Sequence, residues 1–257
     1  MPTSDHYEVA KKVLGNGINC LVEKPLAVSN DQADELIAVA RDKGAVMTVG
    51  HIERFNPAVQ ALKQYRIEPR FIEAHRLAAF DPRGTDVAVI LDLMIHDIEL
   101  SMHLINSEVT HIDASAVAVI SDTADIANAR LTFENGAVAN LTASRISLKA
   151  MRKLRLFQKS GYFSLDLAEK RADIYQLADQ DGAATDGMKI PLGKSGRHII
   201  YNKSTAPNDD MLAAELTSFL NAVAEKKEPE VSALLAAKAL NVALEIERIG
   251  LSNLSHN

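Results

Sequence analysis

The sequence has 257 residues but no tryptophan, a single cysteine and only 5% aromatic residues. With one cysteine, Cys20, the chain cannot form an internal disulfide, and a reducing compartment is the natural location. No apolar run is long enough to span a membrane, and the first residues lack the basic-then-apolar pattern of a signal peptide. We therefore expect a cytoplasmic protein without a membrane partner.

Positive charge is not in excess either. The net charge is -6, and lysines and arginines form no cluster that overrides this average, which argues against a nucleic-acid partner. The composition, 47% hydrophobic and 24% charged, is that of an ordinary globular protein. The length allows one large domain or two modest ones.

A third absence is a glycine motif. A dinucleotide site normally opens with a strand, the sequence G-x-G-x-x-G and a helix, and no such fingerprint occurs in the chain. Residues 15–17 (G-N-G) follow an expected helix, and Cys20 stands where the third glycine belongs. Residues 193–195 (G-K-S) resemble the end of a phosphate loop, but Met188 replaces its first glycine.

The first fifty residues alternate between helix and strand signals. Short apolar runs at 18–22 and 46–50 have the length of buried strands. A helix is expected before the first run, ending at Gly15, and a second from Ser29 to Gly44. This alternation indicates a parallel sheet with crossover helices.

The pattern changes from about residue 52. Helices are expected at 55–66, 88–105, 208–225 and 231–249, strands at 70–78, 109–120, 126–133, 138–147, 154–158, 162–167 and 172–177, and a loop at 178–196. An Asn-Gly turn at 134–136 joins two of these strands directly, which is typical of an antiparallel sheet. The fold class is therefore α/β plus α+β. Residues 1–51 are expected to form part of a Rossmann-type parallel sheet, and residues 52–257 an α+β domain with a large, mainly antiparallel open sheet.

The strand at 18–22 ends in Glu23-Lys24-Pro25. Ligands of open α/β sheets bind outside the carboxyl ends of the strands. Lys24 is therefore either a solvated charge at a strand end or a catalytic ammonium, and its position alone favours the solvated charge.

The expected helix at 88–105 carries polar groups on a mostly apolar circumference. At about 100° per residue, Asp92, His96, Glu99 and His103 share one narrow arc. Three interpretations compete: a narrow solvated face, a metal site for which no convincing third ligand is found, and an acid/base pair of histidine and carboxylate.

Four segments in order resemble the glucose–fructose oxidoreductase / inositol dehydrogenase (Gfo/Idh/MocA) family. They are the Glu-Lys-Pro motif at 23–25, Asp92-x-x-x-His96, and the flanking stretches 2–7 (P-T-S-D-H-Y) and 50–57 (G-H-I-E-R-F-N-P). The similarity covers essentially the whole chain and is weakest at 178–196.

The resemblance implies an oxidoreductase that uses NAD or NADP to oxidise a secondary alcohol of a sugar, nucleotide sugar or cyclitol. It places Lys24 beside the substrate hydroxyl and the nicotinamide, His96 as general acid/base, and Asp92 as an orienting group for a hydroxyl. The residues that it implies for cofactor binding are Glu23, Lys24, Pro25 and Arg54.

The resemblance also implies that the chain begins inside the cofactor domain and lacks about 60–80 residues, or roughly two βα units. On this reading the chain is impaired or inactive as a dehydrogenase. The alternative is a non-catalytic ligand-binding or assembly module derived from the family. In both cases a homo-oligomer formed through the antiparallel sheet is expected.

Overall fold

The computed structural model describes residues 2–81, 87–178, 187–193, 196–205 and 210–252. Its first four elements alternate as predicted and form a two-stranded parallel sheet with two helices: α1 (Thr3–Gly15), β1 (Cys20–Glu23), α2 (Asn30–Lys43) and β2 (Met47–Gly50). The Ser29 hydroxyl caps α2 by accepting from the backbone N–H of Gln32, and Gly44 ends the helix in the left-handed conformation. Both predicted limits of this helix are confirmed.

The connection to the large sheet is broken into short turns. The helix predicted at 55–66 is wrong as one element, since η1 (Ile52–Phe55), α3 (Pro57–Gln60) and η2 (Ala61–Gln64) replace it. Pro57 starts a new helix behind the Asn56 cap, because proline fits the first helical position and lacks an N–H to continue a preceding helix.

The second sheet has nine strands in the order β10-β11-β9-β8-β7-β3-β6-β5-β4. All neighbours are antiparallel except the parallel pair β3 and β6. The predicted turn at 134–136 joins β5 to β6, and Gly136 takes the positive φ of 78° that this turn requires. The strands are β3 (Phe71–Leu77), β4 (Val109–Val117), β5 (Ile126–Phe133), β6 (Val138–Ser144), β7 (Met151–Gln158), β8 (Gly161–Asp166), β9 (Arg171–Ala178), β10 (Met188–Pro191) and β11 (His198–Thr205).

The loop predicted at 178–196 needs correction. Residues 188–191 are strand β10, and β11 was not predicted at all. β11 pairs with β9 over its whole length, so cross-strand pairing rather than local sequence makes it a strand. The part of the predicted loop at 179–186 and at 194–195 lies outside the described residues.

The helix predicted at 88–105 is present but not uniform. It opens with a π-helical turn, η3 (Ile90–Met94), and continues as α4 (Ile95–Ile105). π-turns are rare and are often found at functional sites. The turn changes the angular spacing of Asp92 relative to the residues that follow it.

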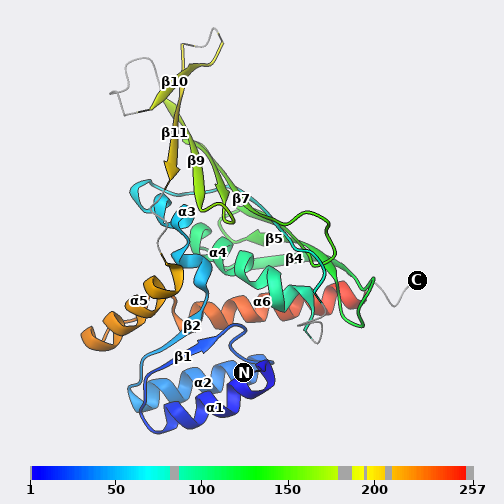
Figure 1. Ribbon diagram of the computed structural model, residues 1–257, viewed down its shortest axis with the longest axis vertical. Helices are drawn as coiled ribbons and strands as arrows, with labels where there is room; N and C mark the ends of the chain where they lie inside the picture. Colours follow the sequence, from blue (N-terminus) through cyan, green and yellow to red (C-terminus); the bar gives the residue numbers. More distant parts are fainter. Residues whose placement is uncertain (1, 82–86, 179–186, 194–195, 206–209, 253–257) are drawn as a thin grey trace.

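Two C-terminal helices complete the fold, α5 (Met211–Glu225) and α6 (Ala233–Ser252). α6 lies between the two sheets, with α1 and α2 on the far side of the small sheet and α4 beneath the large one (Figure 1). One side of α6 contributes Ala236, Ala237 and Leu240 to the core of the small sheet. Another contributes Ala239, Val242 and Ile246 to the core of the large sheet, so α6 joins the two cores.

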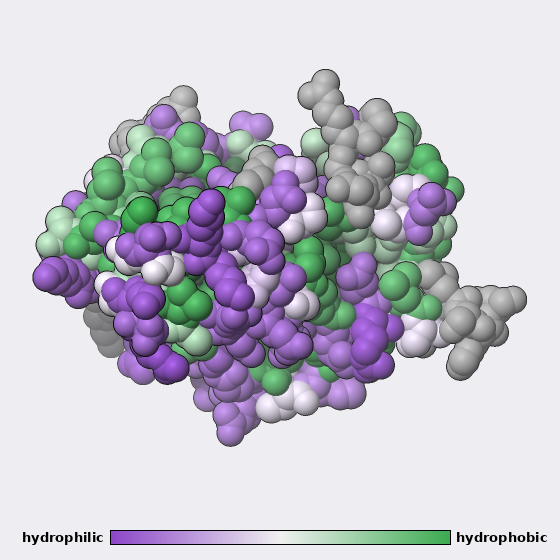
Figure 2. Space-filling model, turned by 90° about the horizontal axis from the view of Figure 1, so that it is seen from below, coloured by the Kyte–Doolittle hydropathy of each residue, from purple (hydrophilic) through white to green (hydrophobic). Residues whose placement is uncertain are grey.

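The surface on the side of α1 and α2 is mixed. Figure 2 shows hydrophilic residues over its centre and hydrophobic residues gathered at the left, the side on which α5 lies in Figure 1. Leu212, Leu216 and Leu220 of α5 are 49%, 44% and 62% exposed. Within the described residues, no helix combines the length and the apolar character needed to cross a membrane.

Candidate active site at the carboxyl ends of the parallel strands

Parallel pairing brings Glu23 at the end of β1 beside Gly50 at the end of β2. The Glu23 side chain lies over Gly50, where an added Cβ would stand only 2.7 Å from its Oε2. Glycine at position 50 therefore allows the carboxylate to lie across the strand ends. Pro25 follows a cis peptide bond and is buried, and its carbonyl oxygen is hydrogen-bonded to His6 Nδ1 at 2.9 Å.

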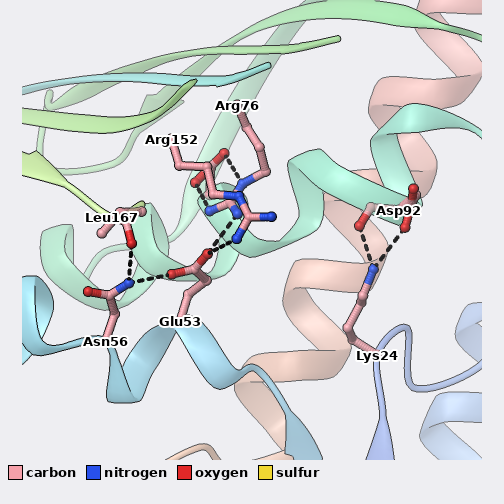
Figure 3. Close-up of polar contacts among 8 residues, drawn as sticks. Lys24, Glu53, Asn56, Arg76, Asp92, Arg152 and Leu167 are labelled. Atoms are coloured by element: carbon pink, nitrogen blue, oxygen red, sulfur yellow. Dashed lines mark hydrogen bonds and ion pairs between the residues drawn. The ribbon is translucent and has the colours of Figure 1, made fainter. Parts of the chain in front are cut away.

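Lys24 reaches from the strand end to the π-turn η3. Its Nζ donates to the Asp92 carbonyl oxygen at 2.5 Å and to Asp92 Oδ1 at 3.1 Å (Figure 3). The lysine side chain is 21% exposed and the aspartate side chain 39%. Lys24 is thus not a freely solvated charge but a half-buried ammonium that a carboxylate holds at the end of the strand.

His96 lies next to His51, which directly follows β2. The centroids of the two imidazole rings are 5.9 Å apart and the rings are nearly perpendicular, at 88°. Burial, followed by the positive charges of Arg76 and Lys24, holds the pKa of His96 well below its ordinary value. Burial, then Lys24 and Arg54, lowers the pKa of His51 to about 3, so both rings are neutral at pH 7.

Each of the two histidines has one ring nitrogen without a described hydrogen-bond partner. The Nδ1 atoms of His51 and His96 are buried and have no partner among the described residues. Buried polar atoms are normally satisfied, so this pair fits a site that a polar ligand completes. His51 was not predicted as a site residue, although it stands in the 50–57 motif and one residue beyond an expected parallel strand.

The polar arc predicted on the helix divides in the structure. Asp92 contacts Lys24, and His96 lies beside His51, close enough for the Lys24 charge to affect it. His103, by contrast, is exposed, and Glu99 is buried against Arg54. Arg54 is 3% exposed, and its Nη1 lies 2.9 Å from Glu99 Oε1. Burial raises the pKa of Glu99 to about 7, although the neighbouring Arg54 opposes the shift. The described contacts of Arg54 are therefore those of a buried ion pair.

A second buried cluster supports the site from the side of the large sheet. Arg76 donates to both carboxylate oxygens of Asp97, at 2.8 and 2.9 Å, and to Glu53 Oε1 at 2.8 Å (Figure 3). Glu53 also accepts from Asn56, which donates in addition to the Leu167 carbonyl. The cluster fixes α4 against η1 and β3. In the sequence, Asp97 stood out only as a polar residue on an otherwise apolar face.

Metal binding receives no support from the part of the chain that the structure describes, in which no three histidine, cysteine or acidic side chains are grouped for a cation. The described residues also line hollows elsewhere. One of about 740 Å³ separates α5 from the η1 region and is lined by Phe55, Asp210 and Glu230 among others.

The strand-end residues fit one part of a nicotinamide dinucleotide. The nicotinamide end of the cofactor and the substrate carry polar groups. These groups can form hydrogen bonds with the unpartnered Nδ1 atoms of His51 and His96 and with the Lys24 ammonium. The Gly-rich sequence that would hold the pyrophosphate does not occur among the 257 residues.

Two family models match the chain. Residues 1–51 match the "Oxidoreductase family, NAD-binding Rossmann fold" model, and residues 64–164 match the "GFO/IDH/MocA C-terminal domain" model. The chain is also 36% identical to UDP-N-acetylglucosamine 3-dehydrogenase of Acidithiobacillus ferrooxidans, over 95% of this chain and 75% of that protein. The chain therefore belongs to the Gfo/Idh/MocA family of oxidoreductases, as its motifs indicated.

A second relative is more distant. The myo-inositol 2-dehydrogenase of Thermotoga maritima is 22% identical over 96% of this chain and 76% of its own length. Among solved structures, the Acidithiobacillus ferrooxidans enzyme superimposes with a TM-score of 0.86 at 37% identity, covering 97% of this chain and 76% of that one. Levoglucosan dehydrogenase in complex with NADH shares the fold, with a TM-score of 0.81 at 16% identity over 98% of this chain and 76% of that one.

Proposed function

We propose that the protein is an NAD- or NADP-dependent dehydrogenase that oxidises a secondary hydroxyl on the sugar ring of a nucleotide sugar. The observation that carries this proposal is the contact of Lys24 with Asp92 at the carboxyl end of β1, with His96 beside His51 at the carboxyl end of β2. The similarity to a UDP-N-acetylglucosamine 3-dehydrogenase favours a nucleotide sugar over a free sugar or cyclitol. The dehydrogenases among its relatives favour an active enzyme over both the impaired enzyme and the non-catalytic module expected from the sequence.

Proton transfer falls to His96. A secondary alcohol must lose its hydroxyl proton as its carbon is oxidised, and a neutral imidazole can accept that proton. The lowered pKa of His96 keeps the ring in this accepting form at neutral pH.

Lys24 supplies the complementary charge. As the hydroxyl proton leaves, negative charge develops on the substrate oxygen, and a fixed ammonium in a half-buried site stabilises it. Asp92 holds the ammonium in place through two oxygen atoms, and its carboxylate also offers an acceptor to a neighbouring hydroxyl.

The cofactor, when bound, supplies the hydride acceptor. We propose that Glu23, Lys24 and Pro25 contact it, because they form the strand end where ligands of such sheets bind. Arg54 belongs to the same proposal through its motif, although its described partners are Glu99 and the Glu230 carbonyl. We extend the proposal to a division of the chain into a cofactor part at 1–51 and a substrate part at 52–257, and to a location in the cytoplasm, in keeping with the free thiol of Cys20.

We also propose a homo-oligomer formed through the large sheet. The sheet face turned away from the core carries five half-buried aromatic rings in a row, with neighbouring centroids 4.7–5.7 Å apart: Phe71, Phe157, Tyr162, Tyr175 and Tyr201. Such a row supplies the large contact area typical of interfaces. Tyr175→Arg, in the middle of the row, should shift the mass measured by light scattering from oligomer to monomer; an unchanged mass contradicts this interface.

The dehydrogenase proposal is tested by titrating the purified protein with NADH, NADPH and UDP-N-acetylglucosamine in separate calorimetric experiments. We expect binding of one reduced cofactor and of the nucleotide sugar, followed by formation of reduced cofactor when sugar and oxidised cofactor are combined. A protein that binds neither cofactor contradicts the proposal.

A further inference from the structure

Arg152 is a charged residue near the candidate site that has no role in the proposed hydride and proton transfers. It stands on β7 directly opposite Arg76 on β3 in the antiparallel register. Directly opposed residues project from the same face of a sheet, and Arg76 contacts Asp97 on α4. Arg152 therefore projects toward the face that α4 covers, as Figure 3 shows.

The two arginines differ in exposure and in contacts. The Arg76 side chain is 5% exposed and donates three hydrogen bonds to carboxylates, whereas the Arg152 side chain is 56% exposed. The nearest carboxylate oxygen to Arg152 is Glu53 Oε1 at 4.0 Å, too far for a hydrogen bond. That same oxygen already accepts from Arg76 at 2.8 Å. No residue that the structure describes accepts a hydrogen bond from the Arg152 guanidinium.

Arg152 also acts on the catalytic region electrostatically. Its positive charge lowers the pKa of His96, by less than burial, Arg76, Lys24 and His51 do. A solvent-accessible guanidinium thus stands at the rim of the site, on the substrate side rather than at the strand ends.

We propose that Arg152 binds the diphosphate of the nucleotide-sugar substrate. This inference rests on the proposed function and names the residue that distinguishes a nucleotide sugar from a neutral sugar or cyclitol. A guanidinium presents paired donors that match phosphate oxygens, and its donors in Arg152 have no described acceptor. A neutral ring in contact with Lys24 and His96 gives such a residue nothing to bind.

The cofactor also contains a diphosphate, so binding of the substrate diphosphate must be distinguished from binding of the cofactor diphosphate. Arg152 comes from the large sheet, whereas Glu23, Lys24 and Pro25 lie at the ends of the parallel strands. We therefore assign Arg152 to the substrate and expect no change in NADH affinity when it is replaced.

The test is calorimetric titration of UDP and, separately, NADH into wild-type protein, Arg152→Gln, Arg152→Lys and Lys153→Gln. Lys153 is a matched control, because it is the next residue on β7, projects from the opposite face and is 47% exposed. We expect UDP affinity to fall at least about tenfold in Arg152→Gln and less in Arg152→Lys, since lysine keeps the charge but not the paired donors. Lys153→Gln should stay within about twofold of wild type.

The inference is overturned if the wild type does not bind UDP, if UDP affinity is unchanged in Arg152→Gln, or if Lys153→Gln shows an equal loss. A loss of NADH affinity in Arg152→Gln that matches the UDP loss also overturns it, since the residue would then bind the cofactor. Sugar oxidation by wild type together with unchanged UDP affinity in Arg152→Gln would remove only this inference, and the proposed function would stand.

Discussion

Lys24 and Asp92 are 68 residues apart in the sequence, and one ammonium group joins them through both the backbone carbonyl and the side-chain carboxylate of Asp92. The contact links the end of a parallel strand to the π-turn that opens the helix beneath the large sheet. It therefore places a cation at the end of β1 next to the carboxylate of the π-turn. The reaction proposed for the protein requires that juxtaposition.

Replacing His96 by Gln should slow sugar oxidation by about 100-fold or more, because a positioned general base commonly contributes that much. Affinity for NADH should change little. His103→Gln is the matched control, since His103 lies on the same helix but is exposed. Steady-state turnover and NADH titration measure both effects. Equal turnover in His96→Gln and wild type would exclude His96 as the base.

The pH dependence of oxidation should reflect a neutral His96. Its pKa lies well below 6.5, and protonation removes the acceptor, so the rate should be flat between about pH 6.5 and 8 and fall only at lower pH. The profile of kcat/KM against pH checks this. A rate that falls to half already at pH 7 contradicts a buried, neutral base.

Arg76→Met should destabilise the protein by about 3–5 kcal/mol, because it leaves two buried carboxylates, Glu53 and Asp97, without their cation. Arg155→Met removes an ion pair with Glu73 on the sheet, but both partners are partly exposed, and the cost should stay below about 1 kcal/mol. Urea unfolding compares the two variants. Similar losses would show that the buried cluster has no special part in stability.

Glu215 makes stability depend on pH. It is 4% exposed, its Oε1 has no partner among the described residues, and burial followed by the charge of Glu23 raises its pKa to about 7. Between pH 4.5 and 7 the folded protein keeps a proton that the unfolded chain loses, so its stability falls as the pH rises.

Glu215→Gln removes this ionisation. Relative to wild type it should gain stability at pH 8 compared with pH 5, by up to about 3 kcal/mol for a shift of this size. Chemical denaturation of both proteins at the two pH values measures the difference. A difference between the proteins that is the same at both pH values contradicts the raised pKa.

Local signals predicted much of the fold. Ser29 and Gly44 marked the limits of α2, and the Asn-Gly turn at 134–136 marked a hairpin, because caps and turns depend on neighbours in the chain. The sequence did not reveal β11, whose strand character comes from pairing with β9. Nor could it show the π-turn at Ile90–Met94, which departs from the 100° spacing on which the polar arc was counted.

The candidate site, too, could be predicted only in part from the sequence. Lys24, Asp92 and His96 were identified from strand-end position, helical spacing and family motifs. The structure joins Lys24 to Asp92 and leaves His96 within reach of the Lys24 charge, while their catalytic roles stay predictions. His51, Arg76 and Arg152 were missed. Their significance lies in contacts with residues far away in the sequence, and those contacts depend on how the two sheets pack around α6.

The most direct test of the account is formation of reduced cofactor from UDP-N-acetylglucosamine and oxidised cofactor by wild type, Lys24→Met and Lys11→Met. Lys11 is a control because it pairs with Glu35 on the surface of α1 and α2, away from the strand ends. We expect wild type and Lys11→Met to form reduced cofactor at similar rates. Lys24→Met should be slower by about 100-fold or more. Wild-type turnover in Lys24→Met would contradict a catalytic ammonium at the strand end.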